Sequence, residues 1–339
     1  MPRRLFWPGV STTVDGVSVP DDLSLPFQVE HCDVRGRLVR LGPVVDGVLE
    51  RHGYPEPVAR LLAEAMTLAA TMATALKFEG VFSLQAKGDG PVSTLVADCR
   101  NSEDGVQLHG LRGYAAFDAD RLLGLSIGPG AELVPLLLGK GYLAFTIDPQ
   151  GEEMERYQGI VDLSGANLAD AAHAYFAQSE QLNARIILAA KRRPDRLGRW
   201  RWRAGGLMLQ QLPEQTPGQT FGQISGETDA ALTPEERTEA WERVTALALT
   251  AKADELTSPD LPPNDLLYRL FHEDGVRVFE PKALEARCTC NSERLVTVLR
   301  SFTTEEIDAI TQDGVIAANC QFCSREYRFD PMNLAEIST

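Results

Sequence analysis

The stretch that decides how this chain is organised lies near its C-terminal end: Cys288-Thr289-Cys290, then 29 residues, then Cys320-Gln321-Phe322-Cys323. In an extended segment residues i and i+2 face the same side, so the first pair can direct both sulfurs to one point. The second pair has the spacing of a knuckle, which presents two thiolates from one tight turn. Four sulfur ligands complete a tetrahedral zinc site and leave no position for a substrate water. The sequence therefore predicts one Zn²⁺ per chain, in a non-hydrolytic role.

Two other interpretations use the same cysteines. An iron–sulfur cluster also takes four thiolates, and a disulfide framework would be possible outside the cytoplasm. The chain opens with Arg3 and Arg4, but Pro8 and Gly9 cut the apolar run far short of a signal peptide. The most apolar helical stretch, 65–76, is shorter than the roughly 18 residues of a membrane span. We therefore expect a cytoplasmic protein without membrane association, in which clustered cysteines indicate metal ligands or redox groups.

The segment around the cysteines is too small to be stable without a metal. Roughly 50 residues with about ten large apolar side chains cannot sustain a core alone. Structural zinc contributes roughly 10–16 kcal/mol in small metallopeptides at neutral pH, more than the whole stability of such a segment. Thiolates are also the oxidisable form of cysteine, so oxidation to disulfides would release the zinc and melt the segment. A permanently closed structural zinc site explains the same residues equally well.

The rest of the sequence predicts an α+β fold. The chain has 339 residues, 44% hydrophobic and 24% charged, which is typical of a globular protein of two to three domains. Apolar spacing predicts a helix over 58–78, a strand–turn–strand pattern predicts a hairpin over 81–97, and an alanine-rich helix is expected over 168–179. Two further strands are expected at 142–147 and 159–163. We divide the chain into an N-terminal extension at 1–25, a core domain with a mixed α/β sheet at 26–213, a metastable helical linker at 214–283, and a small zinc-binding domain at 284–339.

The linker is acidic and weakly amphipathic. Residues 214–283 contain 14 acidic and six basic side chains. Thr233 begins a capping box with proline at the first helical position. In the helix that follows, Trp241, Val244 and Ala248 fall on one face, and this apolar stripe is thin. The helix therefore needs to dock on another surface to be stable, because short isolated helices are marginal in water.

A basic segment at 191–203 contains seven basic residues and interleaves Trp200 and Trp202 with arginines. Such a segment can bind single-stranded nucleic acid by stacking and charge, and a zinc-ribbon protein that binds RNA is our alternative hypothesis. The same alternation fits a hairpin strand with one apolar and one solvated face. We favour the strand, because a net charge of -15 argues against a protein whose main role is to neutralise phosphates.

The motifs of common enzymes are absent from the sequence. It contains no GxSxG, HExxH or GxxxxGK[ST] pattern, and its five histidines are scattered. A thiol oxidoreductase would place CxxC at the start of a helix, whereas a strand pattern follows Cys323. We therefore predict that the protein is not an enzyme.

The cysteine motif and several other segments resemble the heat-shock protein 33 family, bacterial redox-regulated holdase chaperones. The resemblance extends from about residue 34 to residue 337. Its segments are CTCNSER at 288–294, CQFC at 320–323, YRF at 327–329, GDGPV at 88–92, YF and QSEQ within 175–181, AGGLMLQ at 204–210 and LYRLFH at 267–272.

The resemblance implies a reduced, zinc-bound and largely inactive monomer. In such proteins peroxide with heat, or hypochlorous acid, oxidises the cysteines, zinc leaves, the linker unfolds, and exposed apolar surface binds unfolding client proteins, usually as a homodimer. By position, Cys288, Cys290, Cys320 and Cys323 are the zinc ligands and redox sensors. Disulfides would pair Cys288 with Cys290, and Cys320 with Cys323.

The resemblance also gives the linker helix a role. An element that is folded only when docked can respond to the loss of the metal domain, because low-stability elements are the ones that switch. We predict that the helix at 233–251 unfolds on oxidation, with Trp241, Val244 and Ala248 as its switch residues.

Three features lie outside the family pattern. The family usually has glycine after the second knuckle cysteine, where a positive φ is convenient, whereas this chain has Ser324. We expect strain in this turn or a shifted redox sensitivity. Cys32 and Cys99 lie outside the motif, and we interpret them as buried or incidental thiols. Residues 1–25 resemble an extension without an assigned role.

Overall fold

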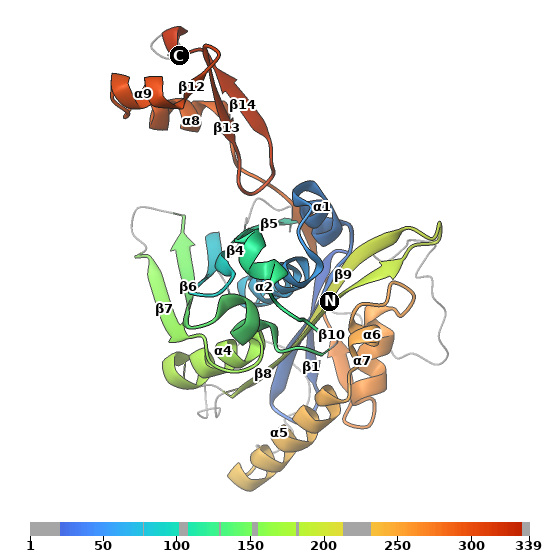
Figure 1. Ribbon diagram of the computed structural model, residues 1–339. Helices are drawn as coiled ribbons and strands as arrows, with labels where there is room; N and C mark the ends of the chain where they lie inside the picture. The colour runs from blue at the N-terminus through green and yellow to red at the C-terminus, as the bar shows by residue number, and fades with distance from the viewer. Residues whose placement is uncertain are drawn as a thin grey trace.

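The computed structural model describes residues 21–76, 78–101, 108–128, 130–150, 155–180, 183–212 and 232–333. Most of the predicted N-terminal extension (1–20) and part of the predicted linker (214–231) therefore lie outside the described residues. The predicted α+β class is confirmed, since helices pack on a large mixed sheet and a small cysteine-containing unit follows at the C-terminal end (Figure 1).

The described strands of the core form one sheet of 11 strands, paired antiparallel except for one parallel pair between β5 and β11. One strand, β10 (Val276–Val278), pairs only with β1 and lies off the main path. Both β10 and β11 come from the C-terminal side of the chain and hydrogen-bond to β1. Strand β1 begins at Leu23, within the predicted N-terminal extension at 1–25. Along the sheet the order is β7 (Tyr157–Asp162), β6 (Gly141–Pro149), β3 (Gly80–Gly88), β4 (Val92–Asn101), β5 (Leu108–Phe117), β11 (Lys282–Ala286), β1 (Leu23–Val29), β2 (Val34–Leu41), β9 (Trp200–Gln211) and β8 (Ala184–Pro194).

The long helix α2 (Glu56–Ala75) fills the main hydrophobic core and confirms the helix predicted at 58–78. It is long and apolar enough to cross a membrane by length and composition, which corrects the shorter apolar stretch counted in the sequence. However, 89% of its apolar window is buried inside the protein, as in the core helix of a globular fold. Thr67, Thr71 and Thr74 are tolerated in this core because each hydroxyl donates to a backbone carbonyl four residues earlier.

The other predicted elements of the core are present. The hairpin expected at 81–97 is β3 and β4, and the strands expected at 142–147 and 159–163 are β6 and β7. The alanine-rich helix is α4 (Leu168–Tyr175), which continues as a π-helical turn to Glu180. The remaining described helices of the core are α1 (Pro43–His52), α3 (Ala119–Leu123) and a π-helical turn at Val134–Leu138.

Three helices from the predicted linker cover the opposite face of the sheet. Adjacent residues of a strand face opposite sides: a Cβ on Gly206 would contact Thr67 of α2, whereas a Cβ on Gly205 would contact Leu256 of α6. The three helices enclose a second hydrophobic cluster together with apolar side chains of β1, β2, β8 and β9. They are α5 (Pro234–Leu249), α6 (Ala253–Leu256) and α7 (Pro263–Phe271).

The chain after β11 forms a small unit that ends at residue 333, and we call this unit the C-terminal module. Figure 1 shows it projecting from one end of the core beside α1. It contains α8 (Ser292–Leu299), α9 (Thr304–Ile310), a sheet of β12 (Thr311–Gln312), β13 (Val315–Asn319) and β14 (Glu326–Phe329), and a 3₁₀ turn at Pro331–Asn333. Its hydrophobic cluster has four buried members: Val296, Leu299, Ile316 and Phe329.

Candidate metal centre

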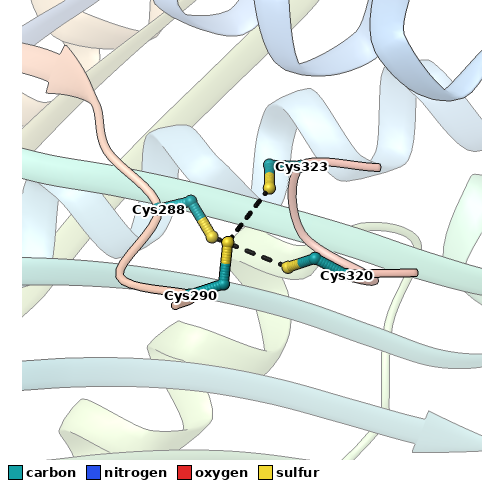
Figure 2. Close-up of side chains that lie close together, drawn as sticks. All are labelled: Cys288, Cys290, Cys320 and Cys323. Atoms are coloured by element: carbon teal, nitrogen blue, oxygen red, sulfur yellow. Dashed lines mark hydrogen bonds between the residues drawn. The ribbon is translucent and has the colours of Figure 1, made fainter. Parts of the chain in front are cut away.

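The four clustered cysteines meet at one point of the C-terminal module. Cys288 and Cys290 lie in the extended segment after β11, and Cys320 and Cys323 lie in the turn between β13 and β14. All four sulfurs lie within 4.8 Å of one another (Figure 2). The sulfur–sulfur distance is 3.7 Å between Cys288 and Cys320, and 3.4 Å between Cys290 and Cys323.

These distances fit a tetrahedral metal ion. With zinc–sulfur bonds of about 2.3 Å, the sulfurs of a tetrahedral site lie about 3.8 Å apart. The cysteines are therefore positioned to bind one metal ion, and a donor set of four thiolates is typical of structural zinc.

Hydrogen bonds shape the knuckle that carries the second pair. The backbone N–H of Ser324 donates to the carbonyl of Cys320 at 2.8 Å, and the N–H of Cys320 donates to the carbonyl of Arg325 at 2.9 Å. Ser324 has φ of 56°, in the left-handed region that favours glycine, so the positive φ expected here is confirmed. Its hydroxyl lies 3.0 Å from Nδ1 of His52 at the end of α1, which links the knuckle to the core.

The clustered thiols differ in their acidity. Burial raises the pKa of Cys290, but a hydrogen bond from the Tyr327 hydroxyl at 3.1 Å and contacts with the other cysteines outweigh it and lower the pKa to about 7. Burial raises the pKa of Cys323 to about 12 and also raises that of Cys288. Cys290 is therefore more readily ionised than either of these two neighbours.

The module also contacts the core through Phe322, one of the two residues between the knuckle cysteines. The ring of Phe322 lies 4.9 Å from the ring of Tyr114 on β5, edge to face, and the guanidinium of Arg112 lies 4.0 Å from its centre. Arg112 is held by Asp98 at 2.6 Å and donates to the hydroxyl of Thr289 at 3.1 Å. Arg112 thus contacts both cysteine motifs. The sequence does not reveal this contact, because no local pattern connects β5 to a knuckle about 200 residues later.

The three residues predicted as linker switch lie on the docked face of α5. Val244 and Ala248 are fully buried, and Trp241 packs half-buried against the second hydrophobic cluster. The predicted capping box is also present, since the Thr233 side chain accepts from the N–H of Glu236.

The basic segment at 191–203 forms the end of the β8–β9 hairpin, as the strand interpretation predicts. Trp202 is buried and Trp200 is 58% exposed, so the two tryptophans do not form one stacking surface. Many of its cations are in ion pairs: Lys191 and Arg193 with Asp254, Arg199 with Asp195, Arg201 with Asp46 and Glu50, and Arg203 with Asp21.

The two cysteines outside the motif are both buried, as expected. Cys32 lies at the β1–β2 turn and Cys99 on β4, far from the four clustered sulfurs in the chain.

The fold and the site together define a two-part protein, in which a sheet-based core carries a small module built around four cysteines. A sequence model of the Hsp33 protein matches residues 22–330. The chain therefore belongs to the heat-shock protein 33 family of chaperones.

Individual relatives agree with this assignment. The chain is 44% identical over 317 residues to the 33 kDa chaperonin of Caulobacter vibrioides, and the alignment covers 92% of this chain and 96% of the relative. It is 39% identical over 319 residues to the 33 kDa chaperonin of Ectopseudomonas mendocina, covering 94% and 95%. The crystal structure of the 33 kDa chaperonin of Thermotoga maritima superposes with a TM-score of 0.71 at 22% identity, over 94% of this chain and 97% of that one, and shows the same fold. These names describe a chaperone role rather than an enzymatic one.

Proposed function

We propose that this protein is a cytoplasmic, redox-regulated holdase that binds unfolding client proteins and prevents their aggregation under oxidative stress. The observation that carries the proposal is the meeting of four sulfurs within 4.8 Å in a module with four buried apolar side chains. The stability of such a module depends on what its cysteines bind, so chemistry at the sulfurs controls whether it stays folded.

In the resting state, Cys288, Cys290, Cys320 and Cys323 would hold one Zn²⁺ as thiolates. The metal supplies a cross-link between the two cysteine motifs when it is bound. The Tyr327 hydroxyl, 3.1 Å from the Cys290 sulfur, donates a hydrogen bond that stabilises negative charge there. The folded module keeps Phe322 against Arg112 and Tyr114 of the core.

Activation would be a two-electron oxidation of each cysteine pair. A thiolate attacks one oxygen of hydrogen peroxide, the O–O bond breaks, and a sulfenic acid and one water form after protonation. The second thiolate then attacks the sulfenic sulfur and displaces a second water, leaving a disulfide. Two peroxides thus oxidise four cysteines and are reduced to four waters, while the zinc ion leaves.

We infer from the family resemblance that the disulfides join Cys288 to Cys290 and Cys320 to Cys323. The sulfur–sulfur contacts at 3.7 Å and 3.4 Å instead join one cysteine of the first motif to one of the second. Tryptic digestion distinguishes the pairings, because cleavage after Arg287, Arg294, Arg300 and Arg325 places each motif in its own peptide. We expect two separate peptides, each lighter by two hydrogens, whereas a covalently joined peptide pair would contradict this pairing.

Loss of the module would then release the linker. The Phe322 and Thr289 contacts to β5 would be lost, and α5 would leave its docked position. Undocking would uncover the apolar side chains of the second hydrophobic cluster, which supply a surface for unfolded chains. We propose that the oxidised protein uses this surface as a homodimer and that the reduced protein is a monomer.

The test follows zinc release and light scattering from a heat-unfolding client, with and without peroxide. We expect peroxide at raised temperature to release one zinc per chain and to suppress scattering, and reductant to reverse both. Cys99→Ala is the control, because Cys99 lies on β4 in the main hydrophobic core, outside the four clustered cysteines and away from the surface that the linker covers, and the variant should leave the response intact. Zinc retention under oxidation, or equal suppression by both states, would show a constitutive metal-stabilised protein instead.

A further inference from the structure

The short helix α6 rests on a group of cations in an otherwise acidic protein. The register of the sheet pairs Arg40 of β2 with Gly205 of β9, and Gly205 with Ala189 of β8. Paired residues share a face of the sheet, and residues two apart on a strand do as well. Arg40, Lys191 and Arg193 therefore lie on the same face as Gly205, the face that α6 covers.

Two of these cations bind one carboxylate of the linker. Oδ1 of Asp254 lies 2.5 Å from Nζ of Lys191 and 2.7 Å from Nη2 of Arg193. Arg193 also donates to the backbone carbonyl of Asp254 at 2.6 Å and to the hydroxyl of Thr257 at 3.1 Å. The linker thus presents an acidic group to a pair of cations on the core.

The third cation is buried under the end of α6. Arg40 is 3% exposed, and its guanidinium donates to the carbonyl of Glu255 at 2.9 Å and to the carbonyl of Ser258. Burial, with a smaller contribution from the charge of Arg193, lowers the pKa of Arg40 to about 10, so it is still cationic at neutral pH. A buried cation is costly unless it is hydrogen-bonded, and both of these acceptors belong to the segment that the proposed activation removes.

An apolar contact lies beside the cations. Leu256 is fully buried in the second hydrophobic cluster, and a Cβ on Gly205 would collide with its carbonyl oxygen. The linker backbone therefore lies directly on the strand, where only glycine leaves room for it. The occupant of this surface is Asp254-Glu255-Leu256, an acidic and apolar sequence.

We propose that the surface formed by Arg40, Lys191, Arg193 and Gly205, which we call the α6 seat, binds acidic, apolar segments of client polypeptides once α6 has left it. The inference rests on the proposed function for the departure of α6. It predicts that the protein prefers acidic client segments to basic ones, a preference that a purely apolar surface would lack. A net charge of -15 disfavours the binding of acidic chains in general, whereas the seat offers them complementary charge next to apolar contacts.

The test uses three fluorescein-labelled peptides of equal length: alternating Leu and Asp, alternating Leu and Lys, and alternating Ser and Asp. We expect the oxidised protein to bind the Leu–Asp peptide about tenfold more tightly than either of the others. Two or three partly desolvated charge pairs and the apolar contacts beside them can supply this difference in affinity. The reduced protein should bind all three weakly, because α6 occupies the seat.

Two variants open the seat without oxidation. Asp254→Lys places a cation beside Lys191 and Arg193, and Leu256→Asp puts a charge into the apolar contact, so both variants change the linker and leave the seat itself intact. Both leave the four clustered cysteines unchanged. We expect each reduced variant to retain its metal and to acquire the Leu–Asp preference, so the seat can be tested even if oxidation fails to release α6.

Arg193→Gln tests whether the cations of the α6 seat bind the acidic peptide, and Arg192→Gln is its matched control. Arg192 lies on the same strand with the same charge, but its side chain alternates to the opposite face. In the oxidised protein we expect Arg193→Gln to reduce the Leu–Asp preference severalfold and Arg192→Gln to leave it unchanged.

Three outcomes would overturn the inference: equal binding of the Leu–Asp and Leu–Lys peptides, a preference that survives Arg193→Gln, or equal binding of the Ser–Asp and Leu–Asp peptides. The last would show a general polyanion site, and inorganic polyphosphate would then displace the peptide. If oxidation suppresses client aggregation but no charge preference appears, only the inference fails. If oxidation has no effect while the opened variants show the preference, only the proposed activation fails.

Discussion

The core and the C-terminal module are folded by different means. The core buries complete aromatic and aliphatic side chains on both faces of its sheet, among them Phe27, Phe82 and Phe145. The module buries four apolar residues and brings four sulfurs together. Full burial of one such side chain contributes about 1.5–3 kcal/mol, so four of them cannot offset the entropy of ordering the module. We therefore expect chemistry at the four sulfurs to unfold the module while the core stays folded.

The largest difference between the two regions is expected when the metal is removed. A chelator added to the reduced protein removes an interaction worth about 10–16 kcal/mol in small metallopeptides. We expect trypsin to cleave rapidly after Arg294 and Arg300 of the module, while Arg60 in α2 stays protected. Added zinc should restore the protection, and a module that resists trypsin without metal would refute its metal dependence.

The reciprocal change removes packing from the core. Phe145→Ala deletes a ring that is 1% exposed and lies 4.7 Å from the ring of Tyr175, and we expect a loss of about 3–5 kcal/mol in the unfolding free energy of the core. Denaturant unfolding followed by circular dichroism measures the loss, and the zinc affinity should not change. Tyr142→Ala, at a 37% exposed position of the same strand, is the control with little expected effect.

A linker variant tests the element between the two regions. Val244→Ala removes two methyl groups from a fully buried position of α5, which we expect to cost about 1–3 kcal/mol of docking free energy. In a chain with Trp241 as its single tryptophan, emission should shift to the red without zinc release. Leu249→Ala removes more carbon from the same helix at a 56% exposed position, and an equal shift there would contradict the docked arrangement.

The direct contact between the two regions should give a smaller effect. Phe322→Ala removes the ring that contacts Arg112 and Tyr114, and we expect a loss of about 1–2 kcal/mol of docking free energy. Hydrogen exchange of the amides of β5 should increase while zinc stays bound. Gln321→Ala, at the exposed neighbouring position, should leave exchange unchanged.

The smallest effect concerns one backbone angle. Ser324 has a positive φ that glycine adopts without strain, so Ser324→Gly should stabilise the knuckle by about 1 kcal/mol relative to Ser324→Ala. Both variants lose the hydroxyl contact to His52, and their difference therefore isolates the backbone. Competition with a chelator measures it, and we expect the glycine variant to release zinc at the higher chelator concentration.

Local patterns in the sequence predicted a large part of this molecule. The spacing of the four cysteines led to a common centre, the apolar period led to α2, and the Thr233 capping box led to α5. The positive φ at Ser324 was expected from the position of glycine in the family. The spacing within each cysteine pair, the apolar period and the capping box depend on residues a few positions apart, whose geometry the backbone dictates. The meeting of the two pairs across 29 residues was expected from the four ligands that a zinc ion takes.

Contacts between distant segments could not be predicted in this way. The seating of Phe322 on Arg112, the cover of α6 over Arg40, and the insertion of β11 between β1 and β5 each join segments far apart in the chain. The basic segment at 191–203 shows the consequence: its pattern suggested either a solvated strand or a nucleic-acid surface, and the fold pairs Lys191 and Arg193 with Asp254 of the linker.

Three properties of this protein are readable in its amino-acid order: two closely spaced cysteine pairs, an acidic linker with a thin apolar stripe, and a globular body large enough to fold by burial. The core surface that the linker covers and the core residues that the module contacts emerge in the folded protein. Ligand spacing and helix periodicity are local properties, whereas docking depends on the shape and charge that distant segments acquire together in the fold.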